Sequence, residues 1–132
     1  MTARLARWAP VALYMGLIFF VSAQPALPQA VEHVWDKARH AVGYAGLAVL
    51  WVWALSDRLR QPVTAGMLVL AWVLTSAYGA SDEWHQSFVP PRQADVADWL
   101  ADSIGATAAV LMAVAWSRWH AATGYNRSRN GL

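Results

Sequence analysis

Four apolar stretches, each almost long enough to cross a lipid bilayer, constrain the fold of this 132-residue chain more than any other feature. A membrane-spanning helix needs about 20 mainly apolar residues, so each stretch would also draw on the amphipathic residues beside it. Hydrophobic residues make up 58% of the chain and charged residues 14%, which is unusual for a soluble domain. We therefore predict a single all-α domain over residues 1–132, an integral membrane four-helix bundle with spans at residues 8–24, 38–55, 65–86 and 95–117 and a tail at residues 118–132.

Charged residues are distributed unevenly along the chain, which predicts how the bundle is oriented. Basic residues gather near both ends and in the connection around Arg58, whereas all acidic residues except Asp57 fall in the other two connections or beside them. Because cytoplasmic loops are the ones enriched in Lys and Arg, we expect both termini to be cytoplasmic. An alternative interpretation of the first stretch is a signal peptide cleaved after Ala23, which would leave this orientation unchanged.

Composition also excludes several classes of protein. The chain has no cysteine, so it contains no disulfide and no thiolate metal site. The net charge of +2, without a run of Lys or Arg, does not indicate nucleic-acid binding. Neither a glycine-rich phosphate loop nor a serine nucleophile elbow is present in the sequence. The oligomeric state is left open.

The last span carries the most informative polar pattern. Asp95, Asp98 and Asp102 are spaced at i, i+3 and i+7, so they share one helix face, which continues inward with Gly105 and Ala109. Asp102 would lie about 10 Å deeper than Asp95, at 1.5 Å per residue. A charge at such a depth is costly unless it faces the bundle interior and a partner. We therefore expect this stripe to point inward.

Two other helices present matching stripes at the same membrane face. In the second span the spacing repeats at i, i+3 and i+7, and in the third a stripe forms if the helix continues past Gly79, with Glu83 and His85 beside it. The stripes are Lys37, His40 and Tyr44 in the second span and Thr75, Gly79, Asp82 and Gln86 in the third. We expect the acids to meet Lys37, His40 and an arginine, Arg92, at the outer surface.

The segment between the third and fourth spans contains a proline turn. Consecutive prolines in "VPPR" cannot continue a helix, so Arg92 is expected on the lip of the polar cluster. Asp95 would then stand at the start of the last helix, where a carboxylate caps free backbone amides.

These stretches resemble the VanZ-like family of bacterial membrane proteins over roughly residues 15 to 110. "SDEWHQSFVPPRQADVADWLADSIGA" is similar to the family signature, and "WDKARHAVGYAGLAVL" to its second conserved stretch. The turn departs from the family by having Pro-Pro-Arg in place of the usual glycine, and the second proline stiffens the turn and forbids the positive φ that glycine allows. The resemblance assigns family positions to Lys37, His40, Tyr44, Asp82, Glu83, Gln86, Arg92, Asp98, Asp102 and Gly105.

The resemblance implies a multi-pass protein of the bacterial cytoplasmic (inner) membrane and, by the family's name, resistance to teicoplanin. We expect membrane lipids as partners and an outer-face polar pocket that binds a lipid, a cell-wall precursor or a lipoglycopeptide. One alternative is an enzyme acting on a lipid-linked phosphate, with Asp98 and Asp102 as acid and base. Another is a structural or partner-binding bundle whose acids form only an ion-pair network. No reaction is identifiable, and we favour a non-enzymatic role.

The sequence contains no spacing typical of a metal site, so we expect neither a metal ligand set nor a cofactor. If a cation is bound, the excess of carboxylates over histidines favours Mg²⁺ or Ca²⁺ over zinc.

Overall fold

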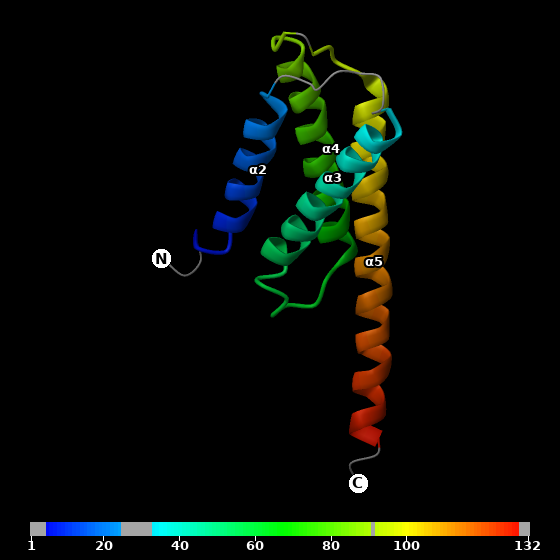
Figure 1. The fold of residues 1–132 in the computed structure, drawn as a ribbon. Helices are drawn as coiled ribbons and strands as arrows, with labels where there is room; N and C mark the ends of the chain where they lie inside the picture. The colour runs from blue at the N-terminus through cyan, green and yellow to red at the C-terminus, as the bar shows by residue number, and fades with distance from the viewer. Residues whose placement is uncertain (1–4, 25–32, 91, 130–132) are drawn as a thin grey trace.

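The computed structural model of the protein describes residues 5–24, 33–90 and 92–129. Within them the chain forms four α-helices and no strands: α2 (Ala9–Ser22), α3 (His33–Leu55), α4 (Ala65–Gln86) and α5 (Val96–Arg129). The helices run alternately up and down, so that the α4–α5 connection lies at the upper end and the α3–α4 connection at the lower end (Figure 1). The predicted all-α fold with four helices is confirmed for this part of the chain.

Side-chain caps explain where two of the helices begin. Thr64 precedes α4, and its hydroxyl accepts a hydrogen bond from the backbone N–H of Met67 at 3.3 Å. Asp95 precedes α5, and its Oδ1 accepts a hydrogen bond from the N–H of Ala97 at 2.8 Å. Each cap satisfies an amide that has no partner within its helix. The predicted capping role of Asp95 is therefore confirmed.

Helix α3 is the centre of the bundle and packs against the other three helices, most extensively against α5. It runs obliquely from the start of α5 toward the lower end of α2 (Figure 1). Small residues allow α3 and α5 to approach closely. A Cβ atom on Gly105 would overlap the carbonyl group of Ala41, and just below this point Ala48, Ala106 and Ala109 form a buried cluster.

Tyrosines attach α2 to the rest of the bundle. The hydroxyl of Tyr14 donates to the carbonyl oxygen of Gly43 at 3.1 Å, and that of Tyr78 donates to the carbonyl oxygen of Met15 at 2.6 Å. These bonds join α2 to α3 and to α4. They supply the orientation that the sequence of α2 does not, because this helix is apolar on every side.

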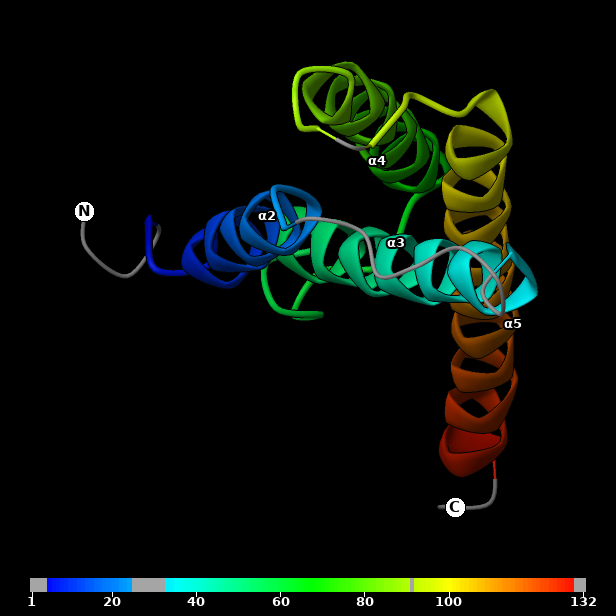
Figure 2. The same ribbon diagram turned by 45° about the horizontal axis from the view of Figure 1, so that its top comes forward.

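One helical stretch, Val96–Ala122 in α5, is long and apolar enough to cross a membrane among the residues described. Helix α2 is apolar but has only 14 residues, and α3 and α4 each carry polar side chains along part of their length. Helix α5 continues to Arg129, so the described part of the expected tail is helical. It extends below the other helices without a neighbour in either view (Figures 1 and 2).

Candidate functional site

A connected polar cluster lies at the upper end of the bundle, where α4 ends and where α3 and α5 begin (Figure 1). Each of these helices contributes one of the predicted stripes, and the α4–α5 connection contributes an arginine. Hydrogen bonds, ion pairs and electrostatic contacts link all the predicted site residues: Lys37, His40, Tyr44, Asp82, Glu83, Gln86, Arg92, Asp95, Asp98 and Asp102.

Helix α4 continues past Gly79 to Gln86, as the third stripe requires. Thr75, Gly79, Asp82 and Gln86 are all buried, so this face points into the bundle. Gly79 is the point where α4 meets Asp102. A Cβ atom at this position would lie 2.7 Å from Oδ2 of Asp102. The missing side chain of the glycine thus provides the space that the Asp102 carboxylate fills.

The part of the cluster nearest the surface, which we call the rim group, consists of Asp36, Lys37, Arg39 and Asp95. Lys37 Nζ donates to Oδ2 of Asp95 at 2.5 Å and to Oδ1 of Asp98, and Arg39 Nη2 donates to Oδ1 of Asp36 at 2.6 Å. Burial lowers the pKa of Lys37, but the bonds to the two carboxylates more than offset it and raise the pKa above its usual range. The carboxylates of the rim group are therefore matched by cations.

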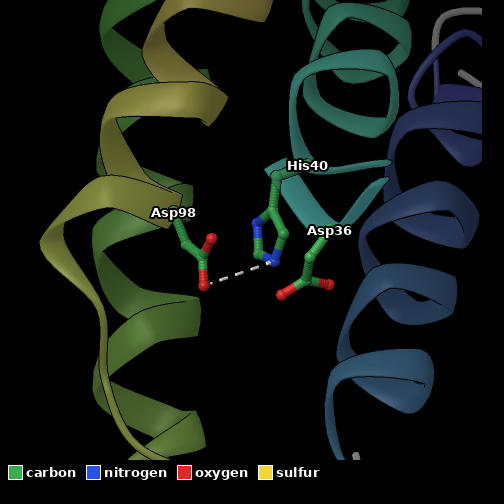
Figure 3. Close-up of side chains that lie close together, drawn as sticks. All are labelled: Asp36, His40 and Asp98. Carbon is green, nitrogen blue, oxygen red and sulfur yellow. Dashed lines mark ion pairs between the residues drawn. The ribbon is translucent and has the colours of Figure 1, made fainter. Parts of the chain in front are cut away.

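Asp98 joins the rim group to the interior. Its side chain is only 9% exposed, and its Oδ2 lies 3.9 Å from Nε2 of His40. Figure 3 shows the imidazole of His40 between the carboxylates of Asp98 and Asp36, with a dashed line marking the contact to Asp98. His40 therefore faces the rim group with one ring nitrogen. Its other ring nitrogen, Nδ1, faces deeper residues.

The deeper part of the cluster, which we call the buried group, consists of His40, Tyr44, Asp82, Glu83 and Asp102. Nδ1 of His40 lies 2.9 Å from Oδ1 of Asp102, which has no exposed surface. The hydroxyl of Tyr44 interacts electrostatically with the carboxylates of Asp82 and Asp102 but makes no hydrogen bond of normal geometry. Four buried oxygens lack a hydrogen-bond partner: Tyr44 Oη, Asp82 Oδ1, Glu83 Oε1 and Asp102 Oδ2.

Two of the buried carboxylates lack a cation. Oδ2 of Asp82 accepts a hydrogen bond from Nε2 of Gln86 at 3.0 Å, and Oε2 of Glu83 accepts one from the N–H of Asp95 at 2.8 Å. Among the described residues, neither carboxylate forms an ion pair. An uncompensated buried carboxylate costs several kcal/mol. The buried group thus contains more carboxyl groups than cationic side chains among the described residues.

Arg92 lies at the upper edge of the cluster, as the proline turn predicts. Its Nε donates to the carbonyl oxygen of Gln24 at 2.9 Å and its Nη1 donates to Oε1 of Gln86 at 3.1 Å. It therefore connects the end of α2 to the end of α4. The second proline of the turn, Pro91, lies outside the described residues.

An open cleft of about 280 Å³ adjoins the buried group between α2 and α4. The ring of Phe19 stacks on that of His85 with centroids 4.2 Å apart, and Trp84 meets Phe88 edge to face. The walls are mainly apolar, and one buried acid reaches them. The lining residues are Phe19, Tyr78, Ser81, Asp82, Trp84, His85 and Phe88.

Sequence reasoning missed this cleft, because it placed His85 only beside the third stripe. Nothing in α2 marks Phe19 as its partner. Two polar contacts between α4 and α5 were missed as well: Ser76 Oγ lies 2.9 Å from Ser103 Oγ, and Nε1 of Trp99 donates to the carbonyl oxygen of Ser76 at 3.1 Å. The serine of α4 lies next to the predicted stripe, at Thr75, and this adjacency was the available signal.

The fold and the cluster together define a class: an all-helical protein that buries acidic and basic side chains between three helices at one end. The model of the VanZ/LLP1 family matches residues 7–117, which includes all of these side chains. The chain therefore belongs to the VanZ-like family, as its sequence motifs indicated. No curated protein and no solved structure matches the chain significantly.

Proposed function

We propose that the protein is a multi-pass protein of the bacterial cytoplasmic membrane, with its polar cluster at the outer face. An inside-out distribution of polarity carries this proposal. Asp102 is completely buried, whereas Leu13, Phe20 and Leu111 expose 75%, 65% and 62% of their surfaces. Water would make both placements unfavourable, whereas a bilayer covers apolar side chains and leaves carboxylates inside the bundle. Membership of the VanZ-like family and the apolar stretch of α5 support the same location.

The distribution of basic residues supports the orientation. Arg7, Arg58 and Arg60 belong to the start of the chain and the α3–α4 connection, at the end opposite the polar cluster (Figure 1). Arg7 Nη1 contacts Oδ1 of Asp57 at 3.3 Å, so the two segments meet there. The positive-inside rule favours the cytoplasm for this end.

The absence of cysteine from the chain allows a direct test of the orientation. Single cysteines would replace Ser87, in the exposed turn after α4, and Gln61, in the exposed α3–α4 connection. In intact cells, a membrane-impermeant maleimide should label Ser87→Cys and should label Gln61→Cys only after lysis. The reverse result would invert the orientation, and labelling of both in intact cells would contradict the membrane topology.

The ligand that we propose is an amphipathic molecule: a lipid, a lipid-linked cell-wall precursor or a teicoplanin-type lipoglycopeptide. Two neighbouring features support it. The cleft between α2 and α4 offers aromatic walls for an acyl chain, and Asp82, with Arg92 at the edge of the cluster, offers polar groups for a head group. The resistance after which the family is named is the reason to include the lipoglycopeptide.

A variant that fills the cleft tests ligand binding without altering the polar cluster. Ser81→Trp would place an indole in the cleft, whereas Ala80→Trp adds the same group at the neighbouring exposed position, outside the lining. Expressed at equal membrane abundance in a teicoplanin-sensitive bacterium, the native chain and Ala80→Trp should protect, and Ser81→Trp should not. Equal protection by both variants would exclude the cleft. No protection by the native chain would remove the lipoglycopeptide and leave lipid binding, measured with a photo-crosslinking lipid on the same variants.

A further inference from the structure

The unpartnered oxygens of the buried group belong to side chains from three helices, α3, α4 and α5. Asp102 Oδ2 belongs to a side chain with no exposed surface, and Tyr44 Oη and Glu83 Oε1 belong to side chains that are 3% and 6% exposed. Buried polar atoms of native proteins nearly always have a partner, and an unpartnered one requires an explanation such as an ion. A group with several such atoms from different helices is therefore the strongest unexplained feature of the molecule.

The hydrogen bonds of Asp82 and Glu83 come from uncharged donors, so they do not neutralise an ionised carboxylate. Asp82 and Glu83 have no cation among the described residues, and Asp102 has only the imidazole of His40. The buried group thus holds three carboxyl groups and one histidine, contributed by α3, α4 and α5. A divalent cation would neutralise this excess and would accept the free lone pairs at the same time.

The spacing of the donor atoms fits such an ion. One ligand atom from each of His40, Glu83 and Asp102 lies within 4.8 Å of the other two. A cation held at about 2.1 Å separates neighbouring ligand atoms by about 3 Å and opposite ones by about 4.2 Å. The 2.9 Å between His40 Nδ1 and Asp102 Oδ1 is already the distance between neighbouring ligands. Only small movements would complete the geometry.

A second trio, formed by Asp36, His40 and Asp98, has similar spacing but lacks free donors. Asp36 accepts from Arg39, and Asp98 accepts from Lys37, whose ammonium group would repel a cation. Figure 3 shows the two carboxylates of this trio on either side of the imidazole. The deeper trio is therefore the better site.

We propose that His40, Glu83 and Asp102 bind one divalent cation, with Asp82 and Tyr44 supplying further oxygens from the surrounding wall. The donors are mostly hard oxygens, which suit Mg²⁺, Ca²⁺ and Mn²⁺, and the single imidazole favours Mn²⁺ among these. The cation would join α3, α4 and α5 at the level of the cluster. This inference is independent of the proposed amphipathic ligand, because cation binding is measured on the protein without that ligand.

Electron paramagnetic resonance on the full-length protein in detergent tests the site. After removal of metals with EDTA, Mn²⁺ should bind at one equivalent per chain, and pulsed spectra should show coupling to one imidazole nitrogen that is lost in His40→Gln. Mg²⁺ or Ca²⁺ should displace the bound Mn²⁺. Bound Mn²⁺ without nitrogen coupling, displacement by Zn²⁺ alone, or no binding at millimolar Mn²⁺ would overturn the proposal.

Matched carboxylate variants place the ion within the cluster. Glu83→Gln and Asp102→Asn keep the shape of each side chain and should each weaken Mn²⁺ binding at least about 10-fold. Asp36→Asn removes a carboxylate of the rim group that pairs with Arg39 and should leave affinity unchanged. Loss of binding in Asp36→Asn alone would move the ion to the outer trio and refute the assignment. If Asp102→Asn does not fold, Glu83→Gln and the nitrogen coupling of the native chain decide the question.

Discussion

The rim group and the buried group both contain acidic and basic side chains, but the two groups differ in how many of their acids have a charged partner. In the rim group each acid meets a Lys or Arg, and the side chains of Arg39 and Asp95 are 61% and 50% exposed. The buried group contains three carboxyl groups and one histidine, and four of its oxygens have no hydrogen-bond partner. The rim group is what a helix end needs for stability and solubility. The buried group is a costly arrangement, which a structural role alone explains poorly.

The comparison predicts its largest effect at the contact between His40 and Asp102. His40→Ala would leave the Asp102 carboxylate buried without its partner. In EDTA, we expect the free energy of unfolding to fall by about 3–5 kcal/mol, because removing one member of a buried charged pair strands the other. Denaturant unfolding in detergent, followed by tryptophan fluorescence, measures it. A loss as small as that of a surface pair would mean that the two groups do not differ in depth.

The close approach of α3 and α5 should give the next largest effect. Gly105→Ala would force the new Cβ against the carbonyl group of Ala41, so the helices must separate. We expect a destabilisation of about 1–3 kcal/mol, as for overpacking in a core. Gly43→Ala is the control, because a Cβ there meets nothing within 4 Å. If both variants lower the thermal midpoint equally, close packing at Gly105 is not what holds α3 against α5.

Lys37→Met tests the bond between the rim group and Asp98. We expect a loss of about 1–2 kcal/mol, since the nearly buried carboxylate of Asp98 loses a charged donor. The raised pKa of Lys37 means that this stabilisation is complete below the usual value of 10.5 and disappears as the pH rises through the higher folded value. The difference in the free energy of unfolding between native and variant protein should therefore stay constant from about pH 7 to about pH 10. A difference that shrinks within this interval would contradict the raised pKa.

The smallest effect is expected at the exposed pair between Asp36 and Arg39. Asp36→Asn should change the free energy of unfolding by less than about 0.5 kcal/mol, because solvent screens such a pair. Unfolding at low and high salt should differ little between native and variant. A loss of unfolding free energy comparable to that of His40→Ala would show that the rim group, too, depends on buried charged pairs.

Much of the cluster could be predicted from the sequence because it depends on helix periodicity. The i, i+3, i+7 spacing on α3 and α5 places Lys37 and His40 opposite Asp98 and Asp102 once both helices start at the same end. The extension of α4 past Gly79 follows from the same logic and is confirmed. Charge patterns and periodicity are local properties of the sequence, so they can be interpreted without knowing how the helices pack.

The aromatic cleft could not be predicted in this way. It depends on which side of α2 faces α4, and an evenly apolar helix has no pattern that selects a side. The choice is made by single contacts, such as the bond from Tyr78 to the carbonyl oxygen of Met15. The unpartnered oxygens could not be predicted either, because spacing shows which residues meet but not which atoms remain free.

The contact of Gly105 with the backbone of Ala41 also acts as a fulcrum. This close approach of the two backbones resists sliding of α5 along α3, so a relative movement of the two helices would be a rotation about Gly105. The residues that α5 contributes to the polar cluster lie on the short side of this point, before Gly105. The long arm reaches about 25 Å from Gly105 to Ala122, at 1.5 Å per residue. A tilt of about 5° would therefore move the far end of this arm by about 2 Å.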